Sequence, residues 1–273
     1  MKLPKYVVLE KPIGKTPLAL IREWKAANGS GDELPVSFAG RLDPMASGKL
    51  LLLVGDECKK QSSYTGLDKE YEMEIVLDVE TDTGDALGIP HYRGSVTKPD
   101  TAALVQALSN ERGSHERAYP VYSSKTVRGK PLFMYALEGT LDSITIPTHT
   151  EIVHATTLVS VTASSTEELK ARITSLLSKA PTSDEPSKAL GADFRIGTIR
   201  PLWDDVFAAA GSRDFVVVRA RAIVGSGTYM RTLANRVART LGTTGIALSI
   251  HRTKIGTYVP LPFGRGLWTR VYR

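Results

Sequence analysis

Apolar and polar residues along the chain follow two different periods, which predict both strands and helices. From Glu70 to Glu80 apolar side chains alternate with acidic ones, as in a strand with one face in water. Residues 215–224 alternate again and place Arg219 and Arg221 on a common face. The run from Lys49 to Val54 is apolar and also predicts a strand.

Apolar residues at three- and four-residue steps predict three helices. Residues 16–25 begin with Thr16 as a candidate N-cap, followed by a proline at the first helical position. Residues 99–108 and 228–241 repeat the helical spacing. The segment Gly225-Ser226-Gly227 joins a predicted strand to the third of these helices.

The order of the elements favours an α+β fold, with a largely antiparallel mixed sheet flanked by helices and loops. Strands and helices are mixed without the regular spacing of βαβ units. Residues 178–193 are rich in Ser, Pro and Ala and aperiodic, which indicates a loop or insertion. We expect one domain over residues 1–260 and a short tail over residues 261–273, while the pattern leaves the shape of residues 148–213 open.

Composition excludes several classes of protein. The one cysteine, Cys58, permits no internal disulfide, and the five histidines lack metal-ligand spacing, so we expect no metal site. No apolar run approaches the roughly 18 residues of a membrane span, and the first residues do not resemble a signal peptide. We therefore expect a soluble, cytoplasmic protein. A complete nucleotide-binding P-loop and the Gly-x-Ser-x-Gly motif of serine esterases are both absent from the sequence.

The net charge of +6 is distributed unevenly along the chain. Residues 201–273 carry 11 Lys+Arg and 3 Asp+Glu, and no acidic residue follows Asp214. A cationic last quarter rich in arginine suits contacts with phosphate, which the planar guanidinium binds in a bidentate manner. The candidate phosphate contacts are Arg219, Arg221, Arg236, Arg239, Arg252 and Lys254.

The segment from Ala39 to Gly48, AGRLDPMASG, carries the candidate chemistry. It holds Asp43 between Leu42 and Pro44, with glycines on both sides. Spacing alone allows two interpretations: a carboxylate that caps a turn, or one on a tight loop that a ligand approaches closely. The stretch resembles the catalytic-aspartate motif of the tRNA pseudouridine-55 synthase (TruB) family, in which Asp43 would be the catalytic aspartate.

Other segments resemble further signatures of the same family, in the same order along the chain. The resemblance implies a pseudouridine synthase fold and an isomerase that flips a T-loop uridine at position 55 of tRNA out of its stack. It implies the tRNA T-arm as partner, with no metal, cofactor, membrane or obligate protein partner. The matching segments are Lys11-Pro12-x-Gly14, Lys69-x-Tyr71, Thr81-Asp82-Thr83-Gly84-Asp85, Pro120 to Ala136, and Ser226 to Leu233.

The resemblance also implies roles for individual residues. Tyr71 would stack on the flipped base and lend its hydroxyl to proton transfer. Arg231 would pair with Asp43 and keep the carboxylate ionised and oriented. The residues expected at the substrate are Lys11, Phe38, Arg41, Tyr229 and Thr253.

Three features depart from the family's pattern. Phe38 stands where bacterial members usually have a histidine that enters the space left by the flipped uridine, and Thr253 stands where the family has a leucine near the base. The fifteen residues after Tyr258 are too few for the C-terminal PUA domain of many members. Two alternatives therefore stay open: a catalytically weak RNA-binding or tRNA-folding protein, and a pseudouridine synthase that acts on another RNA.

Overall fold

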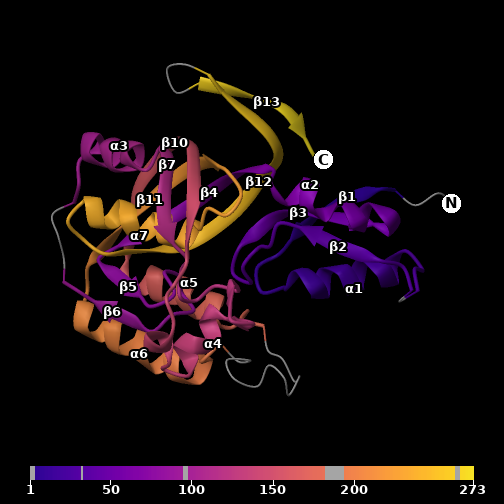
Figure 1. Cartoon of the computed structure of the whole chain (residues 1–273). Helices are drawn as coiled ribbons and strands as arrows, with labels where there is room; N and C mark the ends of the chain where they lie inside the picture. Colours follow the sequence, from indigo (N-terminus) through magenta and orange to yellow (C-terminus); the bar gives the residue numbers. More distant parts are fainter. Residues whose placement is uncertain (1–3, 32, 95–97, 182–193, 262–264) are drawn as a thin grey trace.

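A mixed β-sheet forms the centre of the computed structural model, which describes residues 4–31, 33–94, 98–181, 194–261 and 265–273. Its strands are β1 (Tyr6–Lys11), β2 (Val36–Ala39), β3 (Ser47–Val54), β4 (Asp68–Leu77), β7 (Gly113–Ala118), β10 (Thr148–Ser165), β11 (Asp214–Val224), β12 (Gly245–Leu261) and β13 (Arg265–Val271). They follow the order β1-β3-β12-β4-β11-β10-β7, with β2 on β3 and β13 on β12 (Figure 1). β3 and β12 run parallel, and the other pairs are antiparallel. The predicted α+β fold with a largely antiparallel sheet is confirmed.

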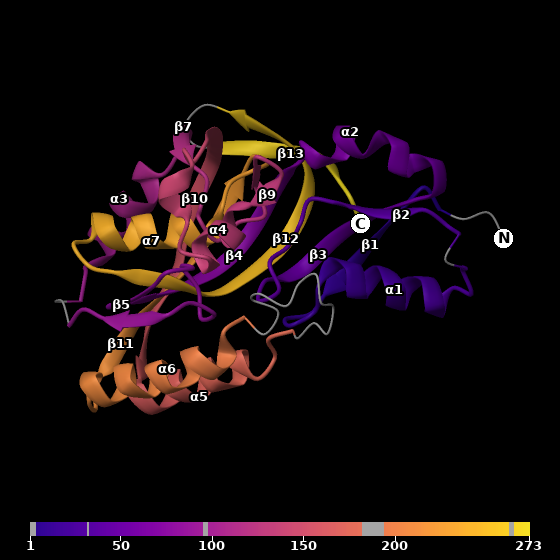
Figure 2. The same ribbon diagram turned by 60° about the horizontal axis from the view of Figure 1, so that its bottom comes forward.

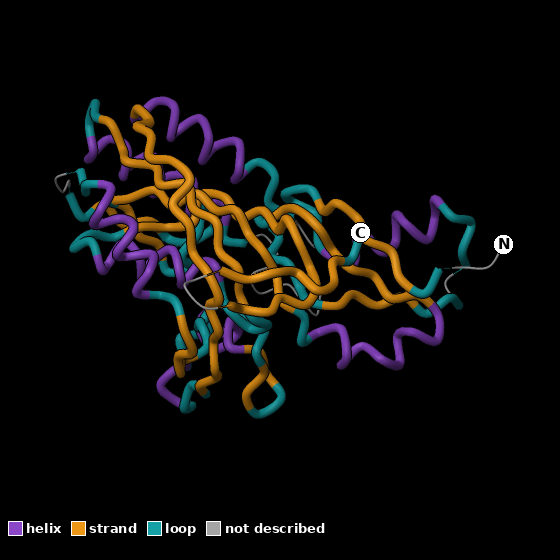
Figure 3. Tube along the Cα trace, turned by 90° about the horizontal axis from the view of Figure 1, so that it is seen from above, coloured by secondary structure: helices purple, strands orange, loops and turns teal. Residues whose placement is uncertain are grey.

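Helices lie against both faces of this sheet (Figures 2 and 3). α3 and α7 pack on one face through Leu104 and Leu233, and α5 and α6 pack on the other through Leu169 and Trp203. Two short hairpins complete the described structure, β5 (Val79–Thr81) with β6 (Pro90–Tyr92) and β8 (Thr126–Val127) with β9 (Lys130–Pro131). The helices are α1 (Pro17–Ala27), α2 (Gln61–Thr65), α3 (Thr101–Asn110), α4 (Leu132–Leu137), α5 (Thr166–Leu177), α6 (Ile196–Ala210) and α7 (Met230–Thr240), with 3₁₀ turns at Gly55–Lys60 and Leu141–Ser143.

The three predicted helices and the apolar strand are present. The hydroxyl of Thr16 caps α1 by accepting from the backbone N of Ala19 at 3.1 Å. The sequence of β3 is a continuous apolar run because both faces of the strand pack against core clusters. Leu50 and Leu52 contact the cluster around α1, whereas alternate residues of the strand belong to a separate cluster on the opposite side. The predicted helix 99–108 corresponds to α3.

The acidic face of the strand predicted at 70–80 is only partly in water, because Glu70 is buried while Glu72 and Glu74 are half-buried. β4 lies between β11 and β12, and cations of the neighbouring elements neutralise its carboxylates. Glu72 pairs with Arg219 and Arg221, and the buried Asp78 pairs with Arg213 at 2.5 Å. The alternation of acidic and apolar residues therefore belongs to a central strand, and arginines of neighbouring elements pair with the carboxylates on its polar face.

Regular elements are also present in the expected tail and in the region whose shape the sequence pattern left open. Within residues 261–273 the described part includes β13, and Tyr272 is buried in a core cluster with Leu51 and Leu53. Residues 148–213 form β10, α5 and α6, with Ser165 and Glu168 making a capping box at the start of α5. Most of the predicted loop at 178–193 lies outside the described residues. None of the described helices combines the length and apolarity that crossing a membrane requires.

Candidate active site

Asp43 lies on the loop between β2 and β3, and the backbone around it is firmly held. The backbone N of Ala46 donates to the Asp43 carbonyl at 3.0 Å and closes a turn. The Pro44 carbonyl accepts from the backbone N of Gly14 at 2.9 Å and from Nζ of Lys11 at 3.1 Å. The Asp43 side chain remains 40% exposed, so this loop presents a carboxylate to solvent from a fixed backbone.

Arg231, in the first turn of α7, faces Asp43, which is the pairing that the family resemblance implied. Its side chain is 6% exposed, and its Nε donates to Oδ2 of Asp43 at 2.8 Å. The two remaining nitrogens donate to the carbonyls of Thr83 at 2.5 Å and Tyr122 at 3.0 Å. Burial opposes the charge of Arg231, but Asp43 and Asp85 outweigh it and raise the pKa of this guanidinium above its ordinary value. The arginine therefore stays charged and is fixed from three directions.

Asp85 is a second carboxylate of the site, and sequence reasoning gave it no role. Its Oδ2 lies 3.7 Å from Nε of Arg231, and its Oδ1 accepts from Thr83 Oγ1 at 2.7 Å and from the backbone N of Leu87 at 3.0 Å. Burial raises the pKa of Asp85, against the influence of Arg231. The Thr-Asp-Thr-Gly-Asp turn was the available signal, because it places an acid and a hydroxyl two residues apart.

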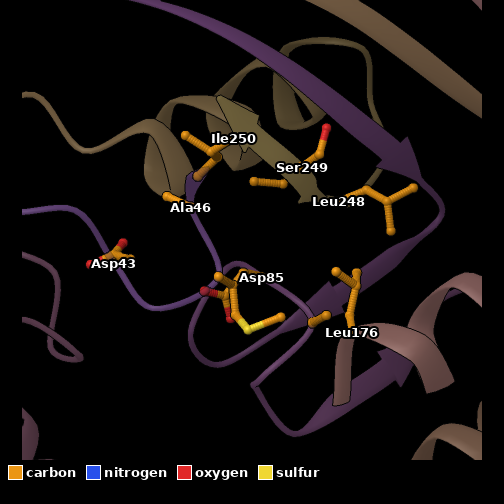
Figure 4. Close-up of a pocket in the computed structure, with 10 residues that line it drawn as sticks. Asp43, Ala46, Asp85, Leu176, Leu248, Ser249 and Ile250 are labelled. Carbon is orange, nitrogen blue, oxygen red and sulfur yellow. The ribbon is translucent and has the colours of Figure 1, made fainter. Parts of the chain in front are cut away.

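A narrow recess extends from these two carboxylates into the protein (Figure 4). Asp43 and Asp85 lie at one end, and Leu176 and Leu248 lie at the other (Figure 4). Its volume of about 10 Å³ is roughly that of one water-sized sphere. A pyrimidine base does not fit there, so a base that reaches Asp43 must lie on the solvent side of its carboxylate or open the recess.

Tyr71 lies on β4 directly beneath the Asp43 loop. Its ring is buried in the core cluster that includes Leu42 and Ala46. Its hydroxyl accepts from Nη1 of Arg252 at 3.4 Å. The structure thus brings Tyr71 next to the loop of Asp43, with the hydroxyl held by an arginine.

Arg252 is fully buried, which corrects its prediction as a phosphate contact. Its guanidinium donates to the carbonyls of Lys49 at 2.6 Å, Gly40 at 3.2 Å and Arg41 at 3.4 Å. β12 approaches β3 closely here, and a Cβ on Gly48 would lie 2.3 Å from the Arg252 carbonyl oxygen, at a φ of +105°. Glycine is therefore required at this position, and Arg252 fixes both ends of the Asp43 loop.

Two buried lysines lie beneath the same loop. Nζ of Lys11 donates to the carbonyls of Pro12 at 3.0 Å and Lys15 at 2.8 Å, in addition to Pro44, and Lys11 is fully buried. Nζ of Lys69 donates to the carbonyl of Thr65 at 3.0 Å. The expected substrate contact of Lys11 is thus replaced by a supporting role. Burial lowers the pKa of both lysines to about 8.

These lowered pKa values predict that stability rises with pH in alkaline solution. Between the folded pKa of about 8 and the ordinary value of 10.5, the unfolded chain binds more protons than the folded chain. Relative to a Lys69→Met variant, the wild type should gain up to about 1 kcal/mol of unfolding free energy per pH unit over this window. Chemical denaturation from pH 7.5 to 10 measures the difference, and parallel curves for the two proteins would contradict the prediction.

The remaining predicted site residues lie around this centre at different depths. Arg41 is exposed, and its Cζ lies 5.8 Å from the ring centroid of Phe38, which packs partly against the α1 cluster. Tyr229 is half-buried at the N-terminus of α7. Thr253 sits at an irregularity of β12, and its Oγ1 donates to Oε1 of Glu70 at 2.7 Å. Within the described residues no hydrogen bond links Thr253 to the Asp43 loop.

Most of the cations expected at phosphate are paired with carboxylates of the protein. In addition to the pairs of Glu72 with Arg219 and Arg221, Arg236 donates to Glu111 at 2.8 Å and to Glu151 at 3.1 Å. Lys254 lies 3.2 Å from Glu70. These ion pairs offset part of the positive charge of the last quarter, while the side chains of Arg219, Arg221 and Lys254 stay 51%, 46% and 41% exposed.

Comparisons with known proteins identify a family that this chain resembles. The model of the TruB family pseudouridylate synthase N-terminal domain matches residues 33–176, which include Asp43, Tyr71 and Asp85. The tRNA pseudouridine synthase B of Xanthomonas campestris pv. campestris (strain 8004) is 35% identical over 170 residues, which cover 62% of this chain and 54% of that protein. The protein of the same name from Hydrogenovibrio crunogenus is 27% identical over 255 residues, covering 93% and 65%.

The chain spans about half to two thirds of the length of these curated relatives. Among solved structures, a chain of the crystal structure of a Cbf5-Nop10-Gar1 complex is 16% identical, with a TM-score of 0.53, over 92% of this chain and 48% of that one. At this identity the likeness concerns the fold alone. Since the family match covers more than half of its residues, the chain belongs to the TruB family of pseudouridylate synthases.

Proposed function

We propose that this protein isomerises a uridine of the tRNA T-loop, at position 55, to pseudouridine. The observation that carries the proposal is the Asp43–Arg231 pair, in which a 40% exposed carboxylate is oriented by a buried arginine. The reaction breaks the bond between C1′ and N1 of the base and forms one between C1′ and C5. It transfers no electrons to or from the substrate, so a positioned carboxylate can serve it as nucleophile or base.

The geometry of the site suits this chemistry. Arg231 donates from Nε to one carboxylate oxygen of Asp43 and fixes the direction of that oxygen. The other carboxylate oxygen is left to face a base turned out of its stack, at a cost of a few kcal/mol for unstacking. Phe38 and Arg41 are proposed to contact the RNA around the flipped base. Arg252 and Lys11 are proposed to hold the loop that carries Asp43.

A direct test follows the hydrogen at C5, which the isomerisation releases from the base. A tRNA transcript made with uridine tritiated at C5 should release tritium with this protein, and the same transcript with cytidine at position 55 should release none from that site. Equal release from both transcripts would assign the activity to another uridine. Binding without any release, on tRNA and on total RNA, would favour an RNA-binding or tRNA-folding protein instead.

Tyr71→Phe keeps the ring and removes only the hydroxyl. If the hydroxyl takes part in proton transfer, the single-turnover rate should fall by about 10²-fold while RNA affinity stays within about twofold. Filter binding and rapid quench on the same RNA measure the two quantities. An equal loss of affinity and rate would show that the hydroxyl serves only to hold the site through Arg252.

A further inference from the structure

β12 continues past the active site and forms a hairpin with β13, which arches away from the other strands at the top of Figure 1. In this hairpin Val259 pairs with Leu267, and Leu261 pairs with Arg265. A bulge follows, since Tyr258 pairs with Trp268 and Thr257 pairs with Arg270, which leaves Thr269 without an opposite residue. Residues directly opposite one another share a face, so the bulge brings Arg270 to the same face as Arg265 and Leu267.

One face of the hairpin is uncovered, and we call it the hairpin face. It consists of Thr257, Val259, Leu261, Arg265, Leu267 and Arg270, all of them exposed. Its aliphatic side chains are 40%, 44% and 48% exposed for Val259, Leu261 and Leu267. On the opposite face Tyr258 is buried and packs edge-on against Trp268, with ring centroids 5.4 Å apart. The packing of Tyr258 against Trp268 therefore supports the hairpin from one side, and the apolar residues of the hairpin face are exposed because they lie on the other side.

The hairpin face is also positive, without a carboxylate to balance it. No acidic residue follows Asp214 in the sequence. Within the described part of the chain Arg265 and Arg270 make no ion pair, and Arg270 donates to the hydroxyl of Tyr272 at 3.3 Å. Arg219, Arg221, Arg236 and Lys254, by contrast, are all paired with carboxylates.

The path of β12 places this face within reach of a bound RNA. Arg252 lies beneath the Asp43 loop, and the hairpin face begins five residues later and extends to Leu261. At roughly 3.3 Å per residue it spans about 16 to 30 Å from Arg252 along the strand. An RNA whose loop delivers a base to Asp43 continues into a stem over a comparable distance.

We propose that the hairpin face binds the sugar-phosphate backbone of the RNA stem beside the loop that carries the target uridine. Arg265 and Arg270 contact phosphates, and the aliphatic side chains pack against ribose. Charge complementarity selects this occupant, because a face with two arginines and no acid suits a polyanion. The inference rests on the proposed function and adds to it a contact outside the catalytic centre.

The test is a double variant, Arg265→Ala with Arg270→Ala, compared with Arg200→Ala. Arg200 is an exposed arginine of α6, and its loss removes a positive charge elsewhere. Two lost phosphate contacts should flatten the plot of log affinity against log salt by about 1.5, at roughly 0.7 to 0.9 per contact. Affinity for a T-arm stem-loop at low salt should fall at least tenfold, while the rate at saturating RNA stays within twofold. Arg200→Ala should leave the slope unchanged.

The design separates this inference from the proposed function. If the wild type forms no pseudouridine, the proposed function fails, whatever the salt slope. If the wild type is active and the double variant keeps its slope and affinity, the hairpin contact is overturned. A third variant, Leu267→Ser, tests whether the hairpin face binds a second copy of the chain. If light scattering shows that the wild type self-associates and this variant does not, while RNA affinity is unchanged, the face binds another copy of the chain instead of RNA.

Discussion

Replacing Asp43 by asparagine is expected to abolish pseudouridine formation, lowering turnover by more than about 10³-fold, while RNA affinity stays within about tenfold. Asparagine has the shape of aspartate, and its amide oxygen can still accept from Nε of Arg231 at the distance of 2.8 Å seen here. It lacks the negative charge that a nucleophile or base requires. Tritium release and filter binding on the same tRNA transcript separate the two effects.

Asp56→Asn is a suitable control for this variant. Asp56 is an exposed aspartate that pairs with Lys59 at 2.8 Å, away from the Asp43 loop, and its replacement should leave turnover unchanged. Both variants must be prepared from a host strain that lacks its own enzyme for this uridine. Turnover of Asp43→Asn near that of Asp56→Asn would refute the assignment of Asp43.

The second large effect is expected for Arg231→Ala. Its removal leaves Asp85 buried beside Asp43 without a cation, and an uncompensated buried charge of this kind costs about 3–5 kcal/mol of unfolding free energy. Turnover should also fall by at least about 10²-fold, because Asp43 loses its orientation. The salt dependence of RNA affinity should not change, since Arg231 contacts carboxylates and carbonyls of the protein. Urea unfolding and single-turnover assays measure these quantities.

Arg236→Ala distinguishes loss of catalysis from loss of stability. Arg236 lies on the same helix and pairs with the buried Glu111 and Glu151, so its removal should destabilise the protein by a similar amount. It does not touch Asp43, and the rate of the folded variant at saturating RNA should stay close to that of wild type. If both variants lose rate equally, the effect of Arg231→Ala comes from unfolding and not from the orientation of Asp43.

The sequence by itself determined the local features of this protein. The 3.6-residue period and the Thr16 cap predicted α1, and the alternation at 70–80 predicted β4, because both signals come from neighbouring residues. The motif around Asp43 and the arginine of α7 could be paired through a family resemblance. Their separation of 188 residues carries no local signal that they meet.

Only the tertiary structure determined which charged residues pair with one another and which are buried. Composition indicated a cationic last quarter suited to phosphate, but strand register sets Arg219 and Arg221 opposite Glu74 and Glu72 of β4, so both arginines pair with Glu72 on a half-exposed face of the sheet. The parallel approach of β12 to β3 buries Arg252 under the Asp43 loop, and antiparallel pairing makes a strand of the expected tail. Each of these outcomes depends on which strands become neighbours and in which register. Pairing between residues far apart in the chain is a property of the whole fold, which a period of two or 3.6 residues does not encode.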